Sequence, residues 1–323
     1  MKAAIYTRYG PPEVLRIHDL DTPVPKDDEV LLRVHAASVN PYDWHFLRGI
    51  PYAMRIQSGL LRPKATRLGV DVAGQVERVG GKVTGLKPGD KVFGTCQGAF
   101  AEYVCASEPS FAIKPDNVSF EQAASVPIAG LTALQSLRDK GRIQSGQKVL
   151  INGAAGGVGT FAVQIAKSFG AEVTGVCSTR NVGMVCSLGA DHAIDYTRED
   201  FTSSGQRYDL IFDLVANHSL SACRRVLNPK GIYLVAGVGP GKSVFILLAR
   251  AIEGPLLGVF VPQRFSVFGA KLRKDDLIVL GELMRTGKVT PVIDRSYPLS
   301  EVPEAFRYLE QGHARGKVVI TVS

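Results

Sequence analysis

The chain has 323 residues, of which 45% are hydrophobic, and a formal net charge of +8. This length exceeds what one hydrophobic core usually serves, so we expect two domains, and the composition excludes a disordered or low-complexity protein. The Lys and Arg residues are spread along the chain without a dense basic run, which argues against a nucleic-acid-binding surface.

The first part of the chain, residues 1–127, shows short alternating segments separated by Gly and Pro turns, as at 29–34 and 85–92. This pattern predicts a compact β-rich domain. The N-terminal residues alternate like a strand and lack the apolar run of a secretory signal, so we expect a cytoplasmic protein.

From residue 128 to 268, strand and helix patterns alternate, which predicts a parallel, doubly wound sheet. Residues 269–323 hold a helical pattern at 276–284, a second helix after Pro303 and a closing strand at 317–322. We expect this last part to return to the first domain and complete it. The strands predicted for the parallel sheet are 148–152, 172–177, 192–195, 209–214, 231–236 and 265–268.

Five cysteines form no C-x-x-C pair and leave an odd number, which argues against both a disulfide framework and a clustered zinc site. They are Cys96, Cys105, Cys177, Cys186 and Cys223.

Residues 244–250 and 254–261 are unusually apolar, but Arg250 and Glu253 interrupt them, and neither part approaches the roughly 20 residues of a membrane span. We expect a buried helix followed by an edge strand that pairs with a second subunit. Peripheral membrane attachment is the alternative that is less favoured.

Residues 148–159 run from a short apolar strand into a glycine-rich turn and then into a helical pattern that Gly170 ends. Glycines at 153, 156, 157 and 159 let backbone N–H groups approach a phosphate, and the following helix directs its positive end at it. The sequence therefore predicts a dinucleotide-binding site.

The residues after the second strand of this unit indicate which dinucleotide binds. NAD-binding folds place an Asp or Glu there to hold the ribose hydroxyls, whereas this chain has Ser178, Thr179, Arg180 and Asn181. These donors suit a phosphate, so NADPH is favoured. The alternative is that Arg180 only starts a solvated helix and that both cofactors are accepted.

Six motifs occur in the order that a known family has them. The chain resembles the medium-chain dehydrogenase/reductase superfamily, in its zinc-free, zeta-crystallin-like quinone oxidoreductase branch. The resemblance covers the whole chain and implies a GroES-like β-rich catalytic domain, a Rossmann domain with a doubly wound parallel sheet, and an α/β fold class. The motifs are MKAAIY at 1–6, SVNPYD at 38–43, GDKVF at 89–93, AGLTA at 129–133, AAGGVG at 154–159 and GHARGK at 312–317.

The zinc alcohol dehydrogenases of this superfamily have a Cys ligand where this chain has Ser38, and a Gly-His-Glu where it has Gly69, Val70 and Asp71. Without thiolate and imidazole ligands we expect no tetrahedral metal site. The enzyme must then deliver hydride to an acceptor that is already electron-poor, namely a quinone or a C=C bond conjugated to a carbonyl.

The resemblance assigns three residues to catalysis. Asn40 would face the nicotinamide and donate to a developing enolate oxygen, although it could be only a turn residue before Pro41. Tyr42 and Tyr52 would lie around the acceptor, to stack on a ring or pass a proton, and a plain packing role is the alternative.

The resemblance also implies the cofactor-binding residues. Thr132, expected at a helix start, would bind the nicotinamide end, with a helix cap as the alternative. Tyr196 would contact the 2′-phosphate together with Ser178 and Arg180. The remaining residues assigned to the cofactor are Ala155, Gly156, Gly157, Val158, Gly159, Gly237 and Lys317.

The predicted function is that of an NADPH-dependent quinone oxidoreductase that needs no metal and forms a homodimer. An NADPH-dependent alkenal or enone double-bond reductase is the alternative, since both activities need only a flat conjugated acceptor. A third reading is a non-catalytic relative that keeps the nucleotide site and binds RNA or a vesicle, but the dispersed charge argues against RNA.

Overall fold

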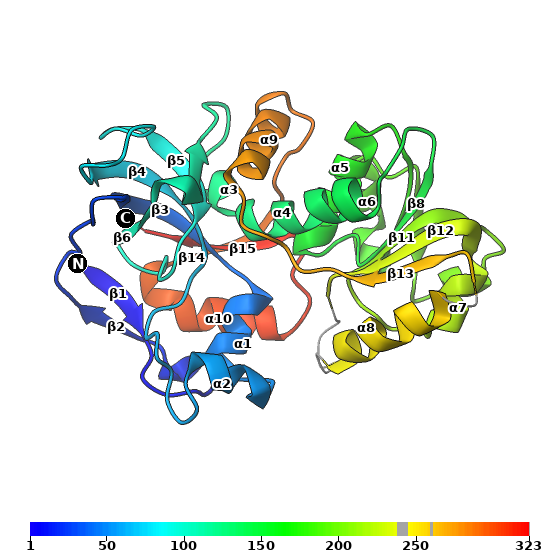
Figure 1. The fold of residues 1–323 in the computed structure, drawn as a ribbon, viewed down its shortest axis with the longest axis horizontal. Coiled ribbons are helices and arrows are strands. Elements are labelled where there is room, and N and C mark those ends of the chain that lie inside the picture. Colours follow the sequence, from blue (N-terminus) through cyan, green and yellow to red (C-terminus); the bar gives the residue numbers. More distant parts are fainter. Residues whose placement is uncertain (238–244, 259–260, 323) are drawn as a thin grey trace. The chain divides into compact units, whose positions relative to one another are not determined.

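The computed structural model describes residues 1–237, 245–258 and 261–322, and the chain divides into two compact units (Figure 1). The first unit comprises Met1–Ile128, Leu272–Gly287 and Pro291–Ser323. The second comprises Ala129–Lys271 and Lys288–Thr290. The chain therefore leaves the first unit once for a long excursion and returns to it.

A mainly antiparallel sheet forms the centre of the first unit, in the order β14-β15-β3-β4-β5-β7, and β6 also pairs with β3. A separate hairpin-like pair, β1 (Lys2–Ile5) and β2 (Arg16–Asp19), lies outside it. Helices flank the sheet, and two of them contribute buried residues to its core, namely Leu47 in one helix and Val302, Ala305 and Phe306 in the other. The strands are β3 (Glu29–Val39), β4 (Asp71–Val79), β5 (Lys91–Thr95), β6 (Tyr103–Ser107), β7 (Phe111–Ile113), β14 (Ile293–Pro298) and β15 (Lys317–Thr321); the helices are α1 (Pro41–Arg48), α2 (Arg55–Ser58), α3 (Phe120–Ala124), α9 (Lys274–Arg285) and α10 (Val302–Glu310).

The register of β3 brings distant residues together. Ser38 of β3 lies opposite Asp71 of β4 on one side and opposite Val319 of β15 on the other. Because β15 and β3 are antiparallel, the same register continued by one step places Lys317 beside Asn40, just beyond the end of β3. Chain segments far apart in sequence thus meet at this end of the sheet.

The second unit is a parallel sheet in the order β10-β9-β8-β11-β12-β13. In Figure 1, α5 and α6 lie on one face of this sheet, and α7 and α8 lie on the other. This is the doubly wound arrangement, and the predicted α/β fold class is confirmed. The strands are β8 (Lys148–Asn152), β9 (Glu172–Cys177), β10 (His192–Asp195), β11 (Tyr208–Asp213), β12 (Leu227–Val235) and β13 (Arg264–Val267); the helices are α4 (Pro127–Gln135), α5 (Gly157–Ser168), α6 (Val182–Ser187), α7 (Leu220–Arg225) and α8 (Phe245–Gly258).

The prediction of an edge strand at 254–261 is wrong for its described part, because residues as far as Gly258 continue helix α8. The strand at the edge of the sheet is β13 instead. A short apolar run has no periodicity that separates a strand from a helix, which explains the error. Val244, Val259 and Phe260 lie outside the described residues.

Helix α8 is also not the fully buried helix that we expected. Ile246, Leu247 and Leu257 pack against the core, but the opposite face is apolar and exposed. That exposed face is formed by Phe245, Leu248, Ile252 and Leu256. Across the described part of the chain, no helix combines the length and the apolar character needed to cross a membrane.

The turn between β8 and α5 yields a stability prediction. A Cβ at Gly159 would lie 2.1 Å from the carbonyl oxygen of Gly153, which is backbone and cannot rotate away. Gly159→Ala should therefore lower the free energy of unfolding by about 2 to 3 kcal/mol, as measured by chemical denaturation.

Gly183→Ala is the matched control, because Gly183 is exposed in α6 and a Cβ there meets nothing within 4 Å. It should raise the free energy of unfolding by about 0.5 to 1 kcal/mol. Equal effects of the two substitutions would contradict the close packing assigned to Gly159.

Candidate active site

The turn that joins β8 to α5 forms a tight backbone cradle. Gly153 has a positive φ of 90°, and the N–H groups of Gly153 and Ala154 donate to the Val176 carbonyl at 3.2 and 3.0 Å. The absence of a side chain at Gly159 lets helix α5 start directly against this turn. The first N–H groups of α5 have no preceding helical carbonyl to bind, so they are suited to a pyrophosphate. The predicted residues Ala155, Gly156, Gly157, Val158 and Gly159 all lie in this turn and the start of α5.

A buried carboxylate fixes the loop after β11. Asp213 Oδ1 accepts hydrogen bonds from Asn152 Nδ2 at 2.8 Å and from the N–H groups of Val215 and Ala216. Its Oδ2 accepts from the buried Tyr233 hydroxyl at 2.7 Å. These bonds fix the backbone of the loop after β11 next to the end of β8, the strand that leads into the glycine-rich turn.

Gly237 follows β12 and borders the same loop. A Cβ there would lie 2.9 Å from the Leu214 carbonyl oxygen. The glycine thus has a packing reason, and its predicted contact with the cofactor stays a prediction.

The predicted phosphate-binding residues lie where β9 and β10 end. Ser178 follows β9 and its hydroxyl accepts from Asn181 Nδ2 at 3.2 Å. Arg180 is exposed in the short 3-10 turn that comes next. Tyr196 follows β10, is 60% exposed, and is anchored by its N–H, which donates to the Cys177 carbonyl at 3.0 Å.

Sequence reasoning missed one acidic residue in this region. Asp195 ends β10, and its carboxylate accepts from the hydroxyls of Thr179 and Thr197 at 2.6 and 2.8 Å. These bonds, that of Thr179 first, hold the pKa of Asp195 below its usual value. Thr179 is therefore engaged with a carboxylate, and the phosphate contacts predicted for Ser178 and Arg180 stay predictions. The Ile-Asp-Tyr sequence at the end of a predicted strand was the available signal.

A cavity of about 360 Å³ opens beside these residues. Tyr196 and Asn217 line it together with His218, whose ring meets the Phe201 ring edge-on at 4.7 Å between centroids. The rest of the lining is Val176, Thr197, Arg198, Glu199, Asp200 and Phe201.

Thr132 is not at a helix start. Helix α4 begins at Pro127, so Thr132 lies inside the helix, and the alternative of an N-terminal cap is wrong. The sequence error came from counting the helix from the Gly-Leu-Thr motif, although Pro127 marks a first helical turn better. The Thr132 side chain is buried.

The first unit contains a buried polar group of four side chains, which we name the Asp71 cluster: Ser38, Asn40, Asp71 and Lys317. Asp71 Oδ2 accepts from Ser38 Oγ at 2.9 Å, from Asn40 Nδ2 at 2.9 Å and from Lys317 Nζ at 3.3 Å. Lys317 Nζ also donates to Asn40 Oδ1 at 2.6 Å. The side chain of Lys317 is 4% exposed and that of Asp71 is fully buried, so the pair is shielded from solvent.

The resemblance implied that Lys317 binds the cofactor. The structure places its ammonium inside the Asp71 cluster, with two protein acceptors, and its predicted contact with the cofactor stays a prediction. The predicted catalytic Asn40 is in the same cluster, whereas Tyr42 and Tyr52 are 50% and 71% exposed. The Tyr52 ring is covered by the Arg55 guanidinium, 4.8 Å from the ring centroid.

A second buried carboxylate, Asp43, adjoins the cluster. Its Oδ2 accepts from the backbone N–H of Asn40 at 2.9 Å and its Oδ1 from that of Gly69 at 3.1 Å, so it closes the start of α1. Burial raises the pKa of Asp43 to about 7, and the negative charge of Asp71 contributes in the same direction.

The residues of the Asp71 cluster do not fit a zinc ion. A lysine ammonium stands 3.3 Å from the carboxylate that would have to ligate the metal, and the other neighbours are a hydroxyl and an amide. Within residues 1–237, 245–258 and 261–322, no three His, Cys, Asp or Glu side chains gather as a metal site requires.

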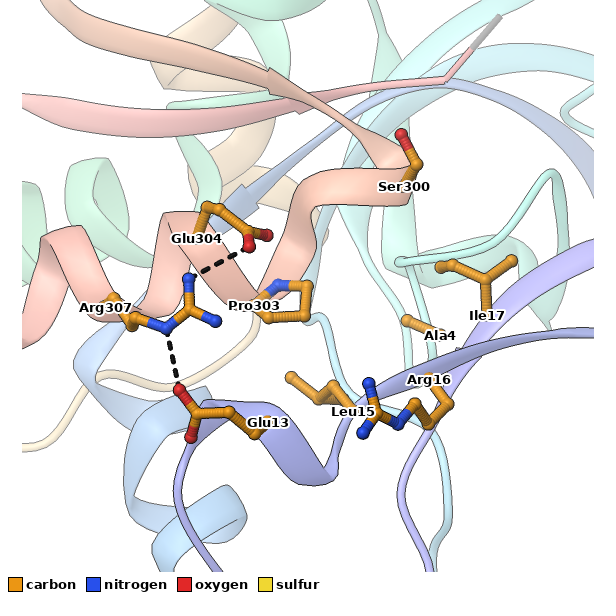
Figure 2. A pocket seen from close by; sticks show the side chains of 9 residues that line it. All are labelled: Ala4, Glu13, Leu15, Arg16, Ile17, Ser300, Pro303, Glu304 and Arg307. Carbon is orange, nitrogen blue, oxygen red and sulfur yellow. Dashed lines mark hydrogen bonds and ion pairs between the residues drawn. The ribbon is translucent and has the colours of Figure 1, made fainter.

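Another cavity, of about 250 Å³, lies between β2 and α10 of the first unit (Figure 2). Figure 2 shows Arg307 between Glu13 and Glu304, with its nitrogens 2.7 and 2.9 Å from their carboxylate oxygens. The Arg307 guanidinium thus pairs with both carboxylates of this cavity, and no predicted site residue lines it.

Two segments of the chain match models of known protein families. Residues 26–116 match the family model described as the alcohol dehydrogenase GroES-like domain, and residues 188–320 match the model described as zinc-binding dehydrogenase. The predicted GroES-like domain is thereby confirmed. The second model is named for zinc binding, but the side chains around Asp71 in this chain are not those of a zinc site.

Three similar proteins cover nearly the whole chain. A 2-methylene-furan-3-one reductase from Solanum lycopersicum is 38% identical, over 99% of this chain and 79% of its own length. An NADPH-dependent alkenal/one oxidoreductase, chloroplastic, from Arabidopsis thaliana is 35% identical over the same shares. The structure of the quinone oxidoreductase from Coxiella burnetii is 35% identical, covers 100% of this chain and 99% of its own, and has a TM-score of 0.87.

The pKa of Asp43 gives a pH prediction. Because it lies above the ordinary 3.8, the folded protein holds a proton that the unfolded chain has already released between about pH 4 and pH 7. The resulting stabilisation is complete below about pH 4 and is lost as the pH rises through 7. The free energy of unfolding of the wild type, minus that of Asp43→Asn, should fall by about 1 to 4 kcal/mol over this range.

Chemical denaturation at several pH values checks this difference, in which the contributions of the other titrating groups cancel. A difference that is constant with pH would show that Asp43 keeps an ordinary pKa.

Proposed function

The chain belongs to the medium-chain dehydrogenase/reductase superfamily, in its quinone oxidoreductase branch, and we propose that it transfers hydride from NADPH to a quinone or to another conjugated carbonyl acceptor. The observation that carries this proposal is the β8–α5 turn. Gly153 and Gly159 have no side chains that would keep a pyrophosphate away from its backbone.

The residues of the second unit fit NADPH. The N–H groups at the start of α5 would bind the pyrophosphate, and Ser178 and Arg180 would bind the 2′-phosphate. Tyr196 and the cavity beside it would accept the adenine ring. When bound, NADPH supplies a hydride, that is, a hydrogen with its electron pair. The similarity to an NADPH-dependent alkenal/one oxidoreductase supports this choice of cofactor.

The acceptor takes the hydride at its electron-poor carbon, and an electron pair moves onto its carbonyl oxygen. That oxygen stays negatively charged until a proton from solvent or from a tyrosine neutralises the reduced acceptor. Asn40 would donate an N–H to the developing charge, which costs no reorganisation because its side chain is held in the Asp71 cluster. Tyr42 and Tyr52, both exposed, are the proposed aromatic contacts or proton donors.

Quinone reduction and enone reduction are both supported by the relatives. One similar solved structure is that of a quinone oxidoreductase, while the two relatives compared by sequence are named 2-methylene-furan-3-one reductase and NADPH-dependent alkenal/one oxidoreductase. A screen of NADPH oxidation against quinones and short-chain enones, side by side, separates the two activities. If NADPH is oxidised with neither the quinones nor the enones, the proposed function is refuted.

We further propose a homodimer. The open edge of β13 and the exposed apolar face of α8 are the surfaces available for it on the second unit. Sedimentation at micromolar concentration tests this, and a monomer would refute it. The cytoplasmic location stays a prediction, since one similar protein is named as chloroplastic; fractionation of the producing cells tests it.

The exposed Arg180 provides a test of cofactor choice. Arg180→Glu replaces a phosphate donor by a carboxylate, so it should weaken NADPH binding by about 1.5 to 3 kcal/mol and leave NADH binding nearly unchanged. Fluorescence titration of both reduced nucleotides measures the effect.

Lys230→Glu is the matched control, because it makes the same charge change in the same unit, at an exposed position of β12 before its central pairing with β11. It should weaken neither nucleotide. If both variants weaken NADPH binding equally, Arg180 acts only through the overall electrostatic potential of the protein and not through a contact with the phosphate.

Asn40 provides a test of catalysis. Asn40→Ala removes the proposed donor to the enolate oxygen, so turnover on an enone should fall about 10- to 100-fold, with the affinity for NADPH nearly unchanged. Steady-state kinetics and nucleotide titration check the two parts. Normal turnover on every acceptor would remove Asn40 from the reaction.

A further inference from the structure

We propose that Lys317 is a positioning residue for the reduction: its ammonium group orients and polarises the Asn40 amide that donates to the acceptor oxygen. This inference rests on the proposed function. It gives a role in the reduction step to a residue that the family resemblance implies as a cofactor ligand.

The orientation of the Asn40 side chain follows from what its neighbours can do. An ammonium group only donates hydrogen bonds, so the amide oxygen, not its nitrogen, must face Lys317 Nζ at 2.6 Å. An ionised carboxylate only accepts, so Nδ2 must face Asp71 Oδ2 at 2.9 Å. Lys317 and Asp71 together therefore permit one of the two amide orientations.

This orientation leaves one N–H of Asn40 weakly used. Nδ2 has two hydrogens, and the second is directed at the Ser38 carbonyl oxygen over 3.4 Å, the longest hydrogen bond within the Asp71 cluster. A bond of that length is at the limit of hydrogen-bond geometry. It is the bond that can be exchanged for a new acceptor oxygen at the smallest loss.

The charge of Lys317 also acts through the amide. A positive group on Oδ1 draws electron density from the amide and makes its N–H groups stronger donors, an effect that hydrogen-bonded chains show most in buried surroundings. Both side chains are almost completely buried, so water screens the charge little. In the resting protein Asp71 balances the charge of Lys317. During the reaction the Asn40 amide would lie between the Lys317 ammonium and the negative charge that develops on the acceptor.

The alternative role of Lys317, as a ligand of the cofactor phosphates, has less support. Its side chain is 4% exposed and its ammonium already has Asn40 and Asp71 as partners. A phosphate would have to displace both of these contacts.

The test is a double-mutant cycle between Lys317→Gln and Asn40→Ala. Glutamine keeps an N–H donor for Asn40 Oδ1 but has no charge. In the wild-type background Lys317→Gln should lower kcat on an enone about 10-fold, with the Kd for NADPH changed less than about 2-fold. In the Asn40→Ala background the same change should lower kcat by less than about 2-fold, because the group through which it acts is absent.

Lys114→Gln is the matched control. Lys114 is also buried in the first unit, but its ammonium donates to the backbone carbonyls of Pro115 and Val118, at 2.9 and 2.6 Å, and to none of the cluster. Its kcat and Kd for NADPH should stay within about 2-fold of the wild type.

Three results would overturn the proposal: equal losses of kcat in both Asn40 backgrounds, a Kd for NADPH raised in step with the loss, or an equal loss in the Lys114→Gln control. If Lys317→Gln does not fold, Lys317→Arg takes its place, since a planar guanidinium keeps the charge but displaces the amide. The proposal then expects a kcat lower by about 3- to 10-fold with an unchanged Kd for NADPH, and a wild-type kcat overturns it.

These failures differ from failure of the proposed function. If the wild-type protein fails to oxidise NADPH with any of the quinones or enones tested, the proposed function is refuted, and this inference with it. A wild-type protein that is active, with additive losses in the cycle, refutes only the role of Lys317.

Discussion

The buried negative charge of Asp71 is the constraint on which the functional end of the first unit depends. A carboxylate removed from water is costly unless donors surround it, and Asp71 has four: Ser38 Oγ, Asn40 Nδ2, Lys317 Nζ and the N–H of Ile128. These donors come from β3 and its end, from β15 and from Ile128, the last residue of the first unit's N-terminal segment. Loss of any one leaves the charge less compensated, so these segments of the first unit are held in one arrangement.

The parallel sheet of the second unit also contains a buried carboxylate that several donors surround. Asp213 is fully buried at the end of β11 and receives hydrogen bonds from Asn152, Tyr233 and two backbone N–H groups of the following loop. In both units a buried carboxylate at one terminus of a strand holds several chain segments in one arrangement. Asn40 and Lys317 contact the first of these carboxylates directly.

The composition of the Asp71 cluster has a chemical consequence. Relatives of the zinc class carry a thiolate and an imidazole where this chain has Ser38 and Val70, and they supply positive charge with a metal. Here the positive charge nearest to Asn40 is the ammonium of Lys317. An ammonium cannot coordinate a carbonyl oxygen, but it can polarise an amide that donates to one. An acceptor that is already electron-poor needs no more, which agrees with quinones and enones as substrates.

Local sequence determined the parallel sheet and the glycine-rich turn. The strands at 148–152, 172–177 and 192–195 have the predicted bounds, because each is a short segment that lies between helical patterns and is closed by turn residues. Gly153 and Gly159 were recognisable because a tight turn and a close helix start exclude a side chain there. The roles given to Ser178, Arg180 and Tyr196 stay predictions, since sequence and fold place them at strand ends without a ligand.

Tertiary structure alone decided which polar groups meet. Lys317 and Asn40 are 277 positions apart, and only the antiparallel register of β15 against β3 brings them together. Asp195 reaches Thr179 because β10 and β9 are neighbours in the sheet, a pairing that no local pattern encodes. Helix α8 was misread for a related reason: an apolar run specifies burial, and its surroundings choose between helix and strand. Local periodicity fixes elements, whereas register and sheet order fix which side chains share a site.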